Sequence, residues 1–282
     1  MMNVGEYKVK KALNNNVVIA ERDNQEVVVI GKGIGFARKN GDWLEQQDIE
    51  KLFVLKDEKE QQSYLKLLPH ISQTMIDVTV EAISLIAKKA GMDLNEHIHI
   101  GLLDHLSFAH ARIAQGMSIE NPFLAETKAL YPREYAIAKE VVALVGQQTG
   151  VQLPEGEIGF IALHIHSAIQ NKSMNIVNSH SQLVSQLVSL VESQFAIKLD
   201  KESMDYLRLV RHLRFTIERV MTGEKVEEPK AIAKLLKQEY PVCYNLSWKL
   251  IKVMQRTLGK PVYDAEAVYL TMHLQRVQNK SK

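Results

Sequence analysis

The pattern of hydrophobic and polar positions changes near residue 60. Before this point, β-branched runs at residues 16–20 and 26–30 flank a polar stretch at 21–25, which is typical of a β-hairpin. Residues 7–10 alternate between hydrophobic and charged side chains and indicate a further strand. Later in the chain, hydrophobic residues recur every three or four positions, and no strong strand pattern is found. The sequence therefore predicts a small antiparallel β domain followed by helices.

Glycine and proline residues divide the second part into segments of ordinary helix length. The segments expected in its first half are residues 67–91, 95–115, 132–149 and 155–170. The second half repeats the arrangement, with breaks at Gly223, Pro229, Pro241 and Gly259. Each half is therefore predicted to be an α-helical bundle of about five helices. A charged bridge at residues 56–62 is expected to be a helix start or a linker, and residues 171–179 are expected to link the bundles.

The two halves share a motif that identifies them as a duplication. Each contains His-Leu-x-Phe followed by an arginine, then a Tyr-Pro pair and a Glu-x6-His segment. The marked positions are His105, Arg112, Tyr131, Glu157 and His164 in the first copy, and His212, Arg219, Tyr240, Glu266 and His273 in the second. In both copies the tyrosine precedes the last histidine by 33 residues. This spacing predicts domains at residues 1–56, 63–170 and 175–282.

The duplication places four histidines in two equivalent pairs: His105 with His164, and His212 with His273. A single histidine is most often structural, but recurrence of the pair favours a functional role, because a neutral imidazole nitrogen can accept a phosphoryl group. Glu157 lies seven residues before His164, about 10 Å along a helix, so the two cannot hydrogen-bond directly. Both glutamates are interpreted as first-turn carboxylates stabilised by the helix dipole. Asp104 is a candidate to orient a histidine on another helix.

Several function classes are not expected. The chain lacks an HExxH motif, so a metal hydrolase is not favoured, and no enzyme activity, metal or cofactor is predicted. The glycine run at residues 31–36 lacks the spacing of a phosphate loop. Cys243 is the lone cysteine, and no apolar run approaches the roughly 18 to 20 residues that span a bilayer, so the expected location is the cytoplasm.

The net charge of +2 is too small to indicate a polyanionic partner, but the charge is uneven. Residues 1–41 carry seven Lys or Arg against four acids. A β domain of this size buries little apolar surface, so it is expected to dimerise. A dimer would double the positive charge, and the combined face could hold a nucleic-acid backbone.

Three stretches of the β domain carry a resemblance to a known family. They are Lys10-Lys11 followed by Asn14-Asn15-Asn16-Val17, then Val-Ile-Gly-Lys-Gly-Ile-Gly-Phe at residues 29–36, and a Lys-x-Gly-Asp ending at residue 42. They resemble the co-antiterminator RNA-binding domain of the BglG/SacY-type transcriptional antiterminators. The duplicated halves resemble that family's two regulatory domains, which are targets of the sugar phosphotransferase system. The first segment and its charged exit at residues 56–60 are most similar to the glucose-system subgroup.

The resemblance implies an RNA-binding homodimer that clasps a hairpin in the leader transcript and prevents the terminator from forming. The matching positions for RNA contact are Lys11, Asn16, Gly31, Lys32, Gly33 and Phe36. These residue types suit RNA recognition, because an amide reads base edges, Lys meets phosphate, glycine exposes backbone groups, and Phe stacks on an unpaired base. Gly33 is about as consistent with a bulge, and Phe36 with a dimer core.

The resemblance also implies phosphorylation at the four paired histidines: His105, His164, His212 and His273. The expected donors are the sugar permease of the phosphotransferase system and its histidine phosphocarrier protein. Phosphorylation of the first regulatory domain is expected to inactivate, and phosphorylation of the second often activates. The alternative is a DNA-binding transcriptional activator with the same regulatory domains. It requires a helix-turn-helix where the sequence predicts strands.

Overall fold

A computed structural model describes residues 7–44, 53–225, 227 and 229–279. The chain divides into two compact units. Unit 1 comprises residues 1–121 and 133–174, and unit 2 comprises residues 122–132 and 175–282. Among the described helices, none has the length and apolar content that a membrane-spanning segment needs. The β domain and most of the first helical half therefore belong to one unit.

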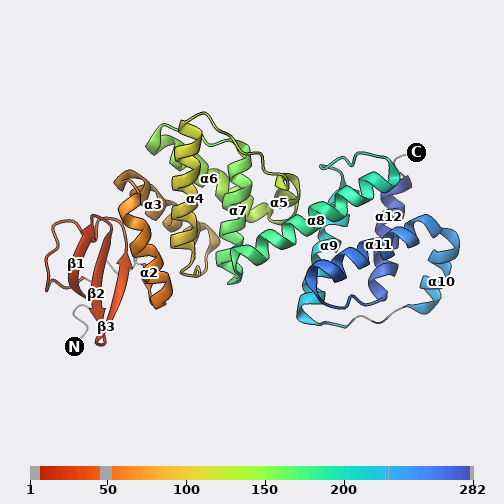
Figure 1. Ribbon diagram of the computed structural model, residues 1–282, viewed down its shortest axis with the longest axis horizontal. Coiled ribbons are helices and arrows are strands. Elements are labelled where there is room, and N and C mark those ends of the chain that lie inside the picture. Colours follow the sequence, from red (N-terminus) through yellow and green to blue (C-terminus); the bar gives the residue numbers. More distant parts are fainter. Residues whose placement is uncertain (1–6, 45–52, 226, 228, 280–282) are drawn as a thin grey trace. The chain divides into compact units, whose positions relative to one another are not determined.

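The N-terminal segment folds into an antiparallel sheet with the order β1-β2-β3-β4 (Figure 1). Its strands are β1 (Lys8–Asn14), β2 (Val17–Arg22), β3 (Gln25–Ile30) and β4 (Phe53–Leu55). Asp23 and Asn24 both have positive φ, which suits the two-residue turn between β2 and β3. The predicted hairpin and the strand before it are confirmed. β4 was not predicted, because three residues are too few to show a period.

The glycine-rich segment at residues 31–36 forms successive turns instead of a strand. Gly33 has a φ of +75°, a left-handed conformation that glycine adopts without strain. At Gly35, an added Cβ would lie 2.0 Å from the carbonyl oxygen of Asn14, so only glycine permits this close approach of the two backbone segments. The Gly35 amide donates to the Asn15 carbonyl at 2.9 Å. These contacts hold the turn before β2 against the turns after β3.

The sheet buries residues on both of its faces. One face packs with the segment after β3 in a cluster that includes Val18, Val29, Ile34 and Leu44. The other packs against helices in a cluster of Val17, Val28, Ile30, Leu55, Tyr64, Ile76, Val80 and Leu103. Successive side chains of a strand point to opposite faces, which explains why β2 and β3 are continuous β-branched runs. This shared core joins the sheet to the first helices.

The helices of unit 1 begin at the charged bridge. They are α2 (Glu58–Leu67), α3 (Gln73–Ala90), α4 (Ile98–Ala114), α6 (Pro132–Thr149) and α7 (Glu155–Gln170), with a 3-10 turn at Leu68–His70. Asp57 and Ser72 cap α2 and α3 by accepting backbone N–H groups three residues later. α4 packs against both α3 and α7 (Figure 1). The bridge is therefore a capped helix start, one of the two predicted possibilities.

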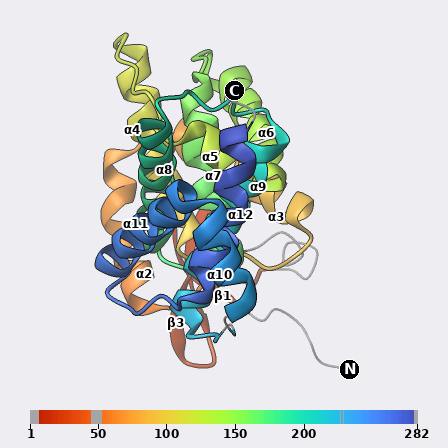
Figure 2. The same ribbon diagram turned by 90° about the vertical axis from the view of Figure 1, so that its right-hand side faces the viewer.

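Unit 2 contains the helices of the second half. They are α8 (Met174–Phe195), α9 (Met204–Thr222), α10 (Lys230–Glu239), α11 (Pro241–Leu258) and α12 (Ala265–Asn279). α12 packs against both α11 and α9 (Figures 1 and 2). The predicted linker at residues 171–179 is wrong for most of its length, because α8 begins at Met174. Val177 and Ser181 are already buried at helical spacing, which explains the early start.

One helix of the first sequence copy lies in the second unit. α5 (Leu124–Leu130) packs against α9. Arg214 of α9 donates to the Leu130 carbonyl at 3.1 Å, and its guanidinium carbon lies 5.0 Å from the centre of the Tyr131 ring. α10, at the corresponding place of the second copy, instead packs against α11 and α12. The repeat therefore marks equivalent sequence positions, while the contacts of these two helices differ.

Candidate RNA-binding surface and histidine sites

The turns at one end of the sheet bring the predicted RNA contacts together. The Gly31 amide donates to the Asn16 carbonyl at 2.9 Å, which places Asn16 beside the glycine-rich turns. Lys32, Gly33 and Phe36 lie in these turns, and Lys11 lies within β1; Lys11, Lys32 and Phe36 are exposed, whereas Asn16 and Gly31 are buried. Phe36 is 70% exposed, so it is free to stack on a base and is not part of the core of unit 1. The RNA-contact role of all six residues stays a prediction.

Two of these residues contact carboxylates of α3. Asn16 is 5% exposed, and both ends of its amide have partners. Its Oδ1 accepts the Gly33 N–H at 2.6 Å, and its Nδ2 donates to Oδ1 of Asp77 at 2.6 Å. The Lys32 ammonium lies 3.3 Å from Oε2 of Glu81, one helical turn further along α3. Sequence reasoning missed these contacts, because the partners are distant along the chain.

The first histidine pair lies between α4 and α7. The ring centres of His105 and His164 are 5.1 Å apart. Nε2 of His105 lies 3.0 Å from Oε2 of Glu157, and the other oxygen of this carboxylate accepts from the Arg112 guanidinium. Both Glu157 and Arg112 are buried. Oε2 of Glu157 and Nε2 of His105 are close without the alignment of a strong hydrogen bond. A buried carboxylate thus holds a histidine and an arginine from the facing helix.

The electrostatics of this pair keep one imidazole neutral. Burial lowers the pKa of His164 to about 3, and the nearby His105 and His97 act in the same direction. Burial raises the pKa of the Glu157 carboxyl, but His105 and Arg112 outweigh it and hold this pKa below its ordinary value. At neutral pH, His164 is therefore an unprotonated imidazole beside a charged carboxylate site. An unprotonated imidazole is the form that acts as a nucleophile.

The second pair has the same frame on α9 and α12 of unit 2. The ring centres of His212 and His273 are 4.7 Å apart. Arg219 donates twice to Glu266, from Nε at 2.8 Å and from Nη2 at 2.9 Å. Thr216 donates to Oε2 of Glu266 at 2.8 Å, and Nε2 of His212 lies 3.6 Å from that oxygen. The carboxylate therefore binds Arg219 and Thr216 more closely than it contacts the histidine.

Both imidazoles of the second pair also favour the neutral form. Burial lowers the pKa of His212 to about 4; His273 and Arg219 reinforce this shift, and Glu266 opposes it. Burial also lowers the pKa of His273, with Arg276 and Arg208 acting in the same direction. The second site therefore shares with the first a pair of neighbouring rings, a buried glutamate and an arginine.

The interpretation of the glutamates was incomplete. Glu157 and Glu266 do stand in the first turns of their helices. Their main contacts, however, come from the opposite helix: Arg112 and His105 for Glu157, and Arg219 and Thr216 for Glu266. A helix-dipole role therefore does not account for them. Asp104, the candidate for orienting a histidine, is exposed on α4. The carboxylate that contacts a histidine of the pair is that of Glu157. An arginine and a glutamate recur together in the two copies, as Arg112 with Glu157 and as Arg219 with Glu266. This recurrence was the signal that could have revealed the pairing.

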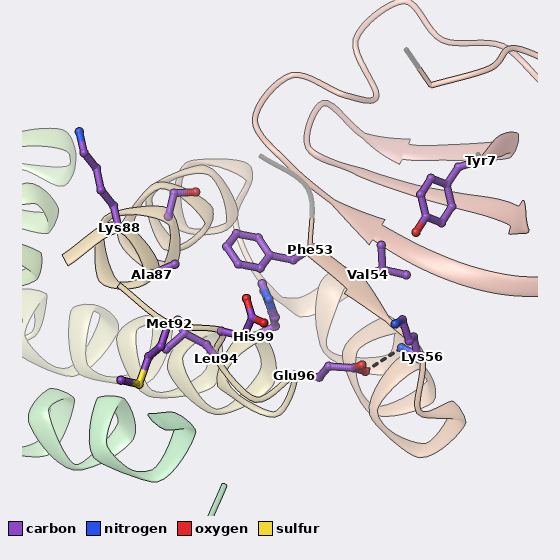
Figure 3. A pocket seen from close by; sticks show the side chains of 12 residues that line it. Tyr7, Phe53, Val54, Lys56, Ala87, Lys88, Met92, Leu94, Glu96 and His99 are labelled. Carbon is purple, nitrogen blue, oxygen red and sulfur yellow. Dashed lines mark hydrogen bonds between the residues drawn. The ribbon is translucent and has the colours of Figure 1, made fainter. Parts of the chain in front are cut away.

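Three of the unpaired histidines have structural partners. His97 Nε2 lies 3.0 Å from the Ser167 hydroxyl, and His166 Nδ1 lies 2.9 Å from Glu134. His99 is buried beside Phe53, with ring centres 4.7 Å apart, in a pocket of unit 1 (Figure 3). Glu96 and Lys56 also line this pocket, and the Glu96 carboxylate accepts the Lys56 backbone N–H at 2.7 Å. The described residues lining this pocket include neither a predicted RNA contact nor a paired histidine.

A sheet that presents basic and aromatic side chains, joined to duplicated histidine-bearing helical bundles, defines a class of RNA-binding regulatory proteins. Residues 7–62 match the CAT RNA binding domain family, and residues 80–168 and 185–277 match the PRD domain family. The chain therefore belongs to the transcriptional antiterminator family that combines a CAT RNA-binding domain with two PRD domains. It is a regulatory protein and not an enzyme.

Known proteins match almost the whole chain. The PtsGHI operon antiterminator of Bacillus subtilis (strain 168) is 54% identical over 277 residues, covering 98% of this chain and 99% of that protein. The GlcA/glcB genes antiterminator of Staphylococcus carnosus (strain TM300) is 38% identical over 273 residues, covering 95% and 94%. A solved structure, described as the crystal structure of GlcT CAT-PRDI, is 52% identical with a TM-score of 0.56. It covers 58% of this chain and 99% of that one.

The matched domain and the strands at residues 8–30 decide between the two predicted functions. A helix-turn-helix needs two helices in the N-terminal segment, and the described residues there form a sheet and turns. The DNA-binding activator is therefore excluded, and the predicted antiterminator family is confirmed.

Proposed function

We propose that the chain is a cytoplasmic, homodimeric antiterminator that binds one RNA hairpin in a nascent leader transcript. Binding keeps the hairpin folded and prevents the overlapping terminator from forming. The proposed target is a glucose-transport operon, as supported by the resemblance to the glucose-system subgroup and by the operon named for the Bacillus relative. Lys11, Asn16, Gly31, Lys32, Gly33 and Phe36 are the proposed RNA contacts.

The observation that carries the proposed control is the repeated site of two neighbouring histidines, a buried glutamate and an arginine. We propose that His105, His164, His212 and His273 accept phosphoryl groups. The lone pair of a neutral imidazole nitrogen attacks the phosphorus of a phosphorylated donor residue, a P–N bond forms, and the bond to the donor breaks. The low pKa values of His164 and His212 keep these rings unprotonated, which satisfies the first requirement of this step.

The arginine and glutamate are proposed to position the rings. Glu157 lies at Nε2 of His105 and is itself fixed by Arg112, so rotation of the His105 ring would break its contact with the buried carboxylate. A phosphoryl group adds about 1.5 to 2 negative charges near this carboxylate. Phosphorylation therefore places like charges close together in a partly dehydrated site. Such repulsion is able to shift an equilibrium between two arrangements of the regulatory domain.

A second copy of the chain is the proposed partner at the regulatory domains. Phe108 and Phe215 hold equivalent places one turn after the first histidine of each pair, and they are 63% and 52% exposed. Exposed aromatics at repeated positions favour a protein contact over a solvated role. Because His105 and His212 lie on the same helices as these aromatics, α4 and α9, a charge added to them would fall close to such a contact.

Phosphorylation by separate donors tests this function. The full chain is incubated with the phosphorylated sugar permease domain or with the phosphorylated phosphocarrier protein, and phosphate is located by mass spectrometry under conditions that avoid acid. We expect phosphate on all four paired histidines, with the permease modifying His105 and His164 and the phosphocarrier modifying His212 and His273.

Single His→Ala variants at the four positions should each lose one phosphate. His110→Ala, which removes an unpaired histidine of α4, is the matched control and should lose none. Hairpin binding by the same samples is measured by filter retention. Phosphate on His110, or no phosphate with either donor, would contradict the assignment.

A further inference from the structure

One face of α3 is directed at the predicted RNA contacts. Gln73, Asp77 and Glu81 follow one another at intervals of four residues, so they share one side of the helix. Asp77 contacts Asn16, and Glu81 contacts Lys32. One predicted base-edge contact and one predicted phosphate contact are therefore both bound by carboxylates of a regulatory-domain helix.

The contact to Asn16 uses the groups that a base would need. The amide Nδ2 donates to Asp77 at 2.6 Å, and Oδ1 accepts from the Gly33 N–H. Asp77 is in turn fixed by Gln73, whose Nε2 donates to the same oxygen. Because Asn16 is only 5% exposed, a nucleotide cannot reach its amide while α3 remains in this position. Recognition of a base edge by Asn16 requires that Asp77 leave.

The contact to Lys32 places a carboxylate where a phosphate would bind. Glu81 accepts from the Gln148 side chain at 2.9 Å and lies 3.3 Å from the Lys32 ammonium. The hydrogen bond from Gln148 lowers the pKa of Glu81, and Lys32 adds to this effect against the smaller opposing effect of burial, so the carboxylate is charged at neutral pH. An exposed pair of this kind contributes little stability alone, since Lys32 is 73% exposed.

Apolar packing holds the acidic face in place. Ile76 and Val80 of α3 stand immediately before Asp77 and Glu81, and both are buried in the cluster that contains Val17 and Ile30 of the sheet. Val17 directly follows Asn16 in the chain. The core that joins the sheet to the helices therefore places the two carboxylates beside Asn16 and Lys32.

We propose that the acidic face of α3, formed by Asp77 and Glu81, is an internal competitor of RNA that holds Asn16 and Lys32 in a closed state. This inference rests on the proposed function, because it needs Asn16 and Lys32 to contact the hairpin. The hairpin binds when α3 withdraws its carboxylates from the two side chains. The first regulatory domain thereby restrains the RNA-binding domain through direct contact within one chain.

The size of the effect follows from the fraction of open molecules. A ligand that binds only the open state has an apparent Kd equal to its intrinsic Kd divided by the open fraction. If about one molecule in ten is open, removing the two carboxylates should tighten hairpin binding about tenfold. The gain should appear in the unphosphorylated full chain, where the closed contact is seen.

The first experiment compares two double variants of the full chain. The probe is an RNA hairpin enriched by the wild-type chain from a library with randomised stem and loop positions. Asp77→Ala with Glu81→Ala removes both acceptor side chains of the acidic face, while Glu120→Ala with Glu140→Ala removes two exposed acids elsewhere in unit 1 and causes the same change in net charge. We expect several-fold to tenfold tighter hairpin binding for the first pair and a smaller change for the control.

Equal affinity of wild type and the first double variant, or equal tightening in both double variants, overturns the inference. The second outcome would show that only net charge matters. A library that yields no enriched hairpin overturns the proposed function, and this inference with it. If the library yields an enriched hairpin but the two double variants bind it equally, this inference fails while the proposed function does not.

The second experiment needs no variant and uses zero-length coupling by a carbodiimide. The reagent activates a carboxylate, the lysine amine attacks it, and an amide forms while the reagent leaves as a urea. In the free chain, Lys32 should couple to Glu81, and Lys89 should couple to Glu140, which lie 2.9 Å apart and serve as the control pair. Saturating hairpin should suppress the first product and preserve the second. An unchanged yield of the Lys32–Glu81 product at saturation overturns the closed-state proposal.

Discussion

Two histidines, the buried His99 and the partly buried His164, are expected to make unit 1 sensitive to mild acid. Burial lowers the pKa of His99 to about 3, and burial with nearby charges lowers the pKa of His164 to about 3. A histidine of an unfolded chain has a pKa of about 6.5. As the pH falls below this value, the unfolded chain binds protons that the folded unit does not bind. The stability due to the neutral rings is present above about pH 6.5 and is lost as the pH falls toward 3.

The loss is large compared with the stability of a domain. Each pH unit below about 6.5 lowers the free energy of unfolding by about 1.4 kcal/mol for each such histidine. At about pH 5 the loss is about 2 kcal/mol for each ring and about 4 kcal/mol for both, against a usual total of about 5 to 15 kcal/mol. His97, whose pKa is also lowered by burial, acts in the same direction. The lowered pKa of Glu157 affects stability only at lower pH.

The two tryptophans provide the assay, because Trp43 lies in unit 1 and Trp248 in unit 2. In a Trp248→Phe background, fluorescence follows the unfolding of unit 1 in urea at pH 7 and at pH 5. We expect the free energy of unfolding to fall by about 4 kcal/mol between these values. His99→Gln or His164→Gln should each reduce this pH-dependent loss by about 2 kcal/mol.

The comparison concerns the change with pH, since either substitution also alters packing at pH 7. His70→Gln, on an exposed turn, is the matched control and should preserve the full loss. If the unfolding free energy of the wild type stays constant between pH 7 and pH 5, the rings are protonated in the folded unit. The argument that they are neutral nucleophiles would then fail for His164.

Three further predictions concern the RNA-binding turns. Phe36→Ala should weaken hairpin binding by about 1 to 3 kcal/mol while leaving the urea midpoint of unit 1 unchanged, because the ring is exposed. Unchanged affinity would contradict a stacking role. Lys32→Ala should weaken matched and scrambled hairpins alike and reduce the slope of log affinity against log salt by about one; an equal slope would show that no phosphate contact is lost. Gly35→Ala should lower the urea midpoint, because its Cβ would lie 2.0 Å from the Asn14 carbonyl oxygen, and a wild-type midpoint would refute this close approach.

The secondary structure could be predicted wherever local rules decide it. The β-branched runs at residues 16–20 and 26–30 became β2 and β3. α6 begins at Pro132 and ends before Gly150, and α7 begins directly after Pro154. β4 could not be predicted, since its three residues form a strand only because β3 offers a partner. The early start of α8 was missed for a related reason: its first buried positions become apparent only when the partner surface is known.

Contacts between distant segments were less accessible to the sequence. The resemblance selected Asn16, but its partner Asp77 lies 61 residues later in another domain. The helical spacing correctly indicated that Glu157 does not hydrogen-bond to His164. It could not show that Glu157 on α7 faces His105 on α4. In each case, the periodicity gives the face of a helix, whereas the neighbour of that face depends on how the helices are arranged.

The repeated sites show how far equivalence of sequence positions extends. Both copies preserve the arginine and the glutamate, but Thr216 corresponds to Ala109 in the first copy. The Thr216 hydroxyl occupies Oε2 of Glu266, and Arg219 binds both oxygens, so His212 lies 3.6 Å away. Without such a hydroxyl, Oε2 of Glu157 lies 3.0 Å from His105. A duplication therefore predicts where the two histidines lie. A single neighbour that is not repeated, Thr216, determines how closely each histidine is held by its carboxylate. The two domains therefore need not respond alike to one phosphoryl group.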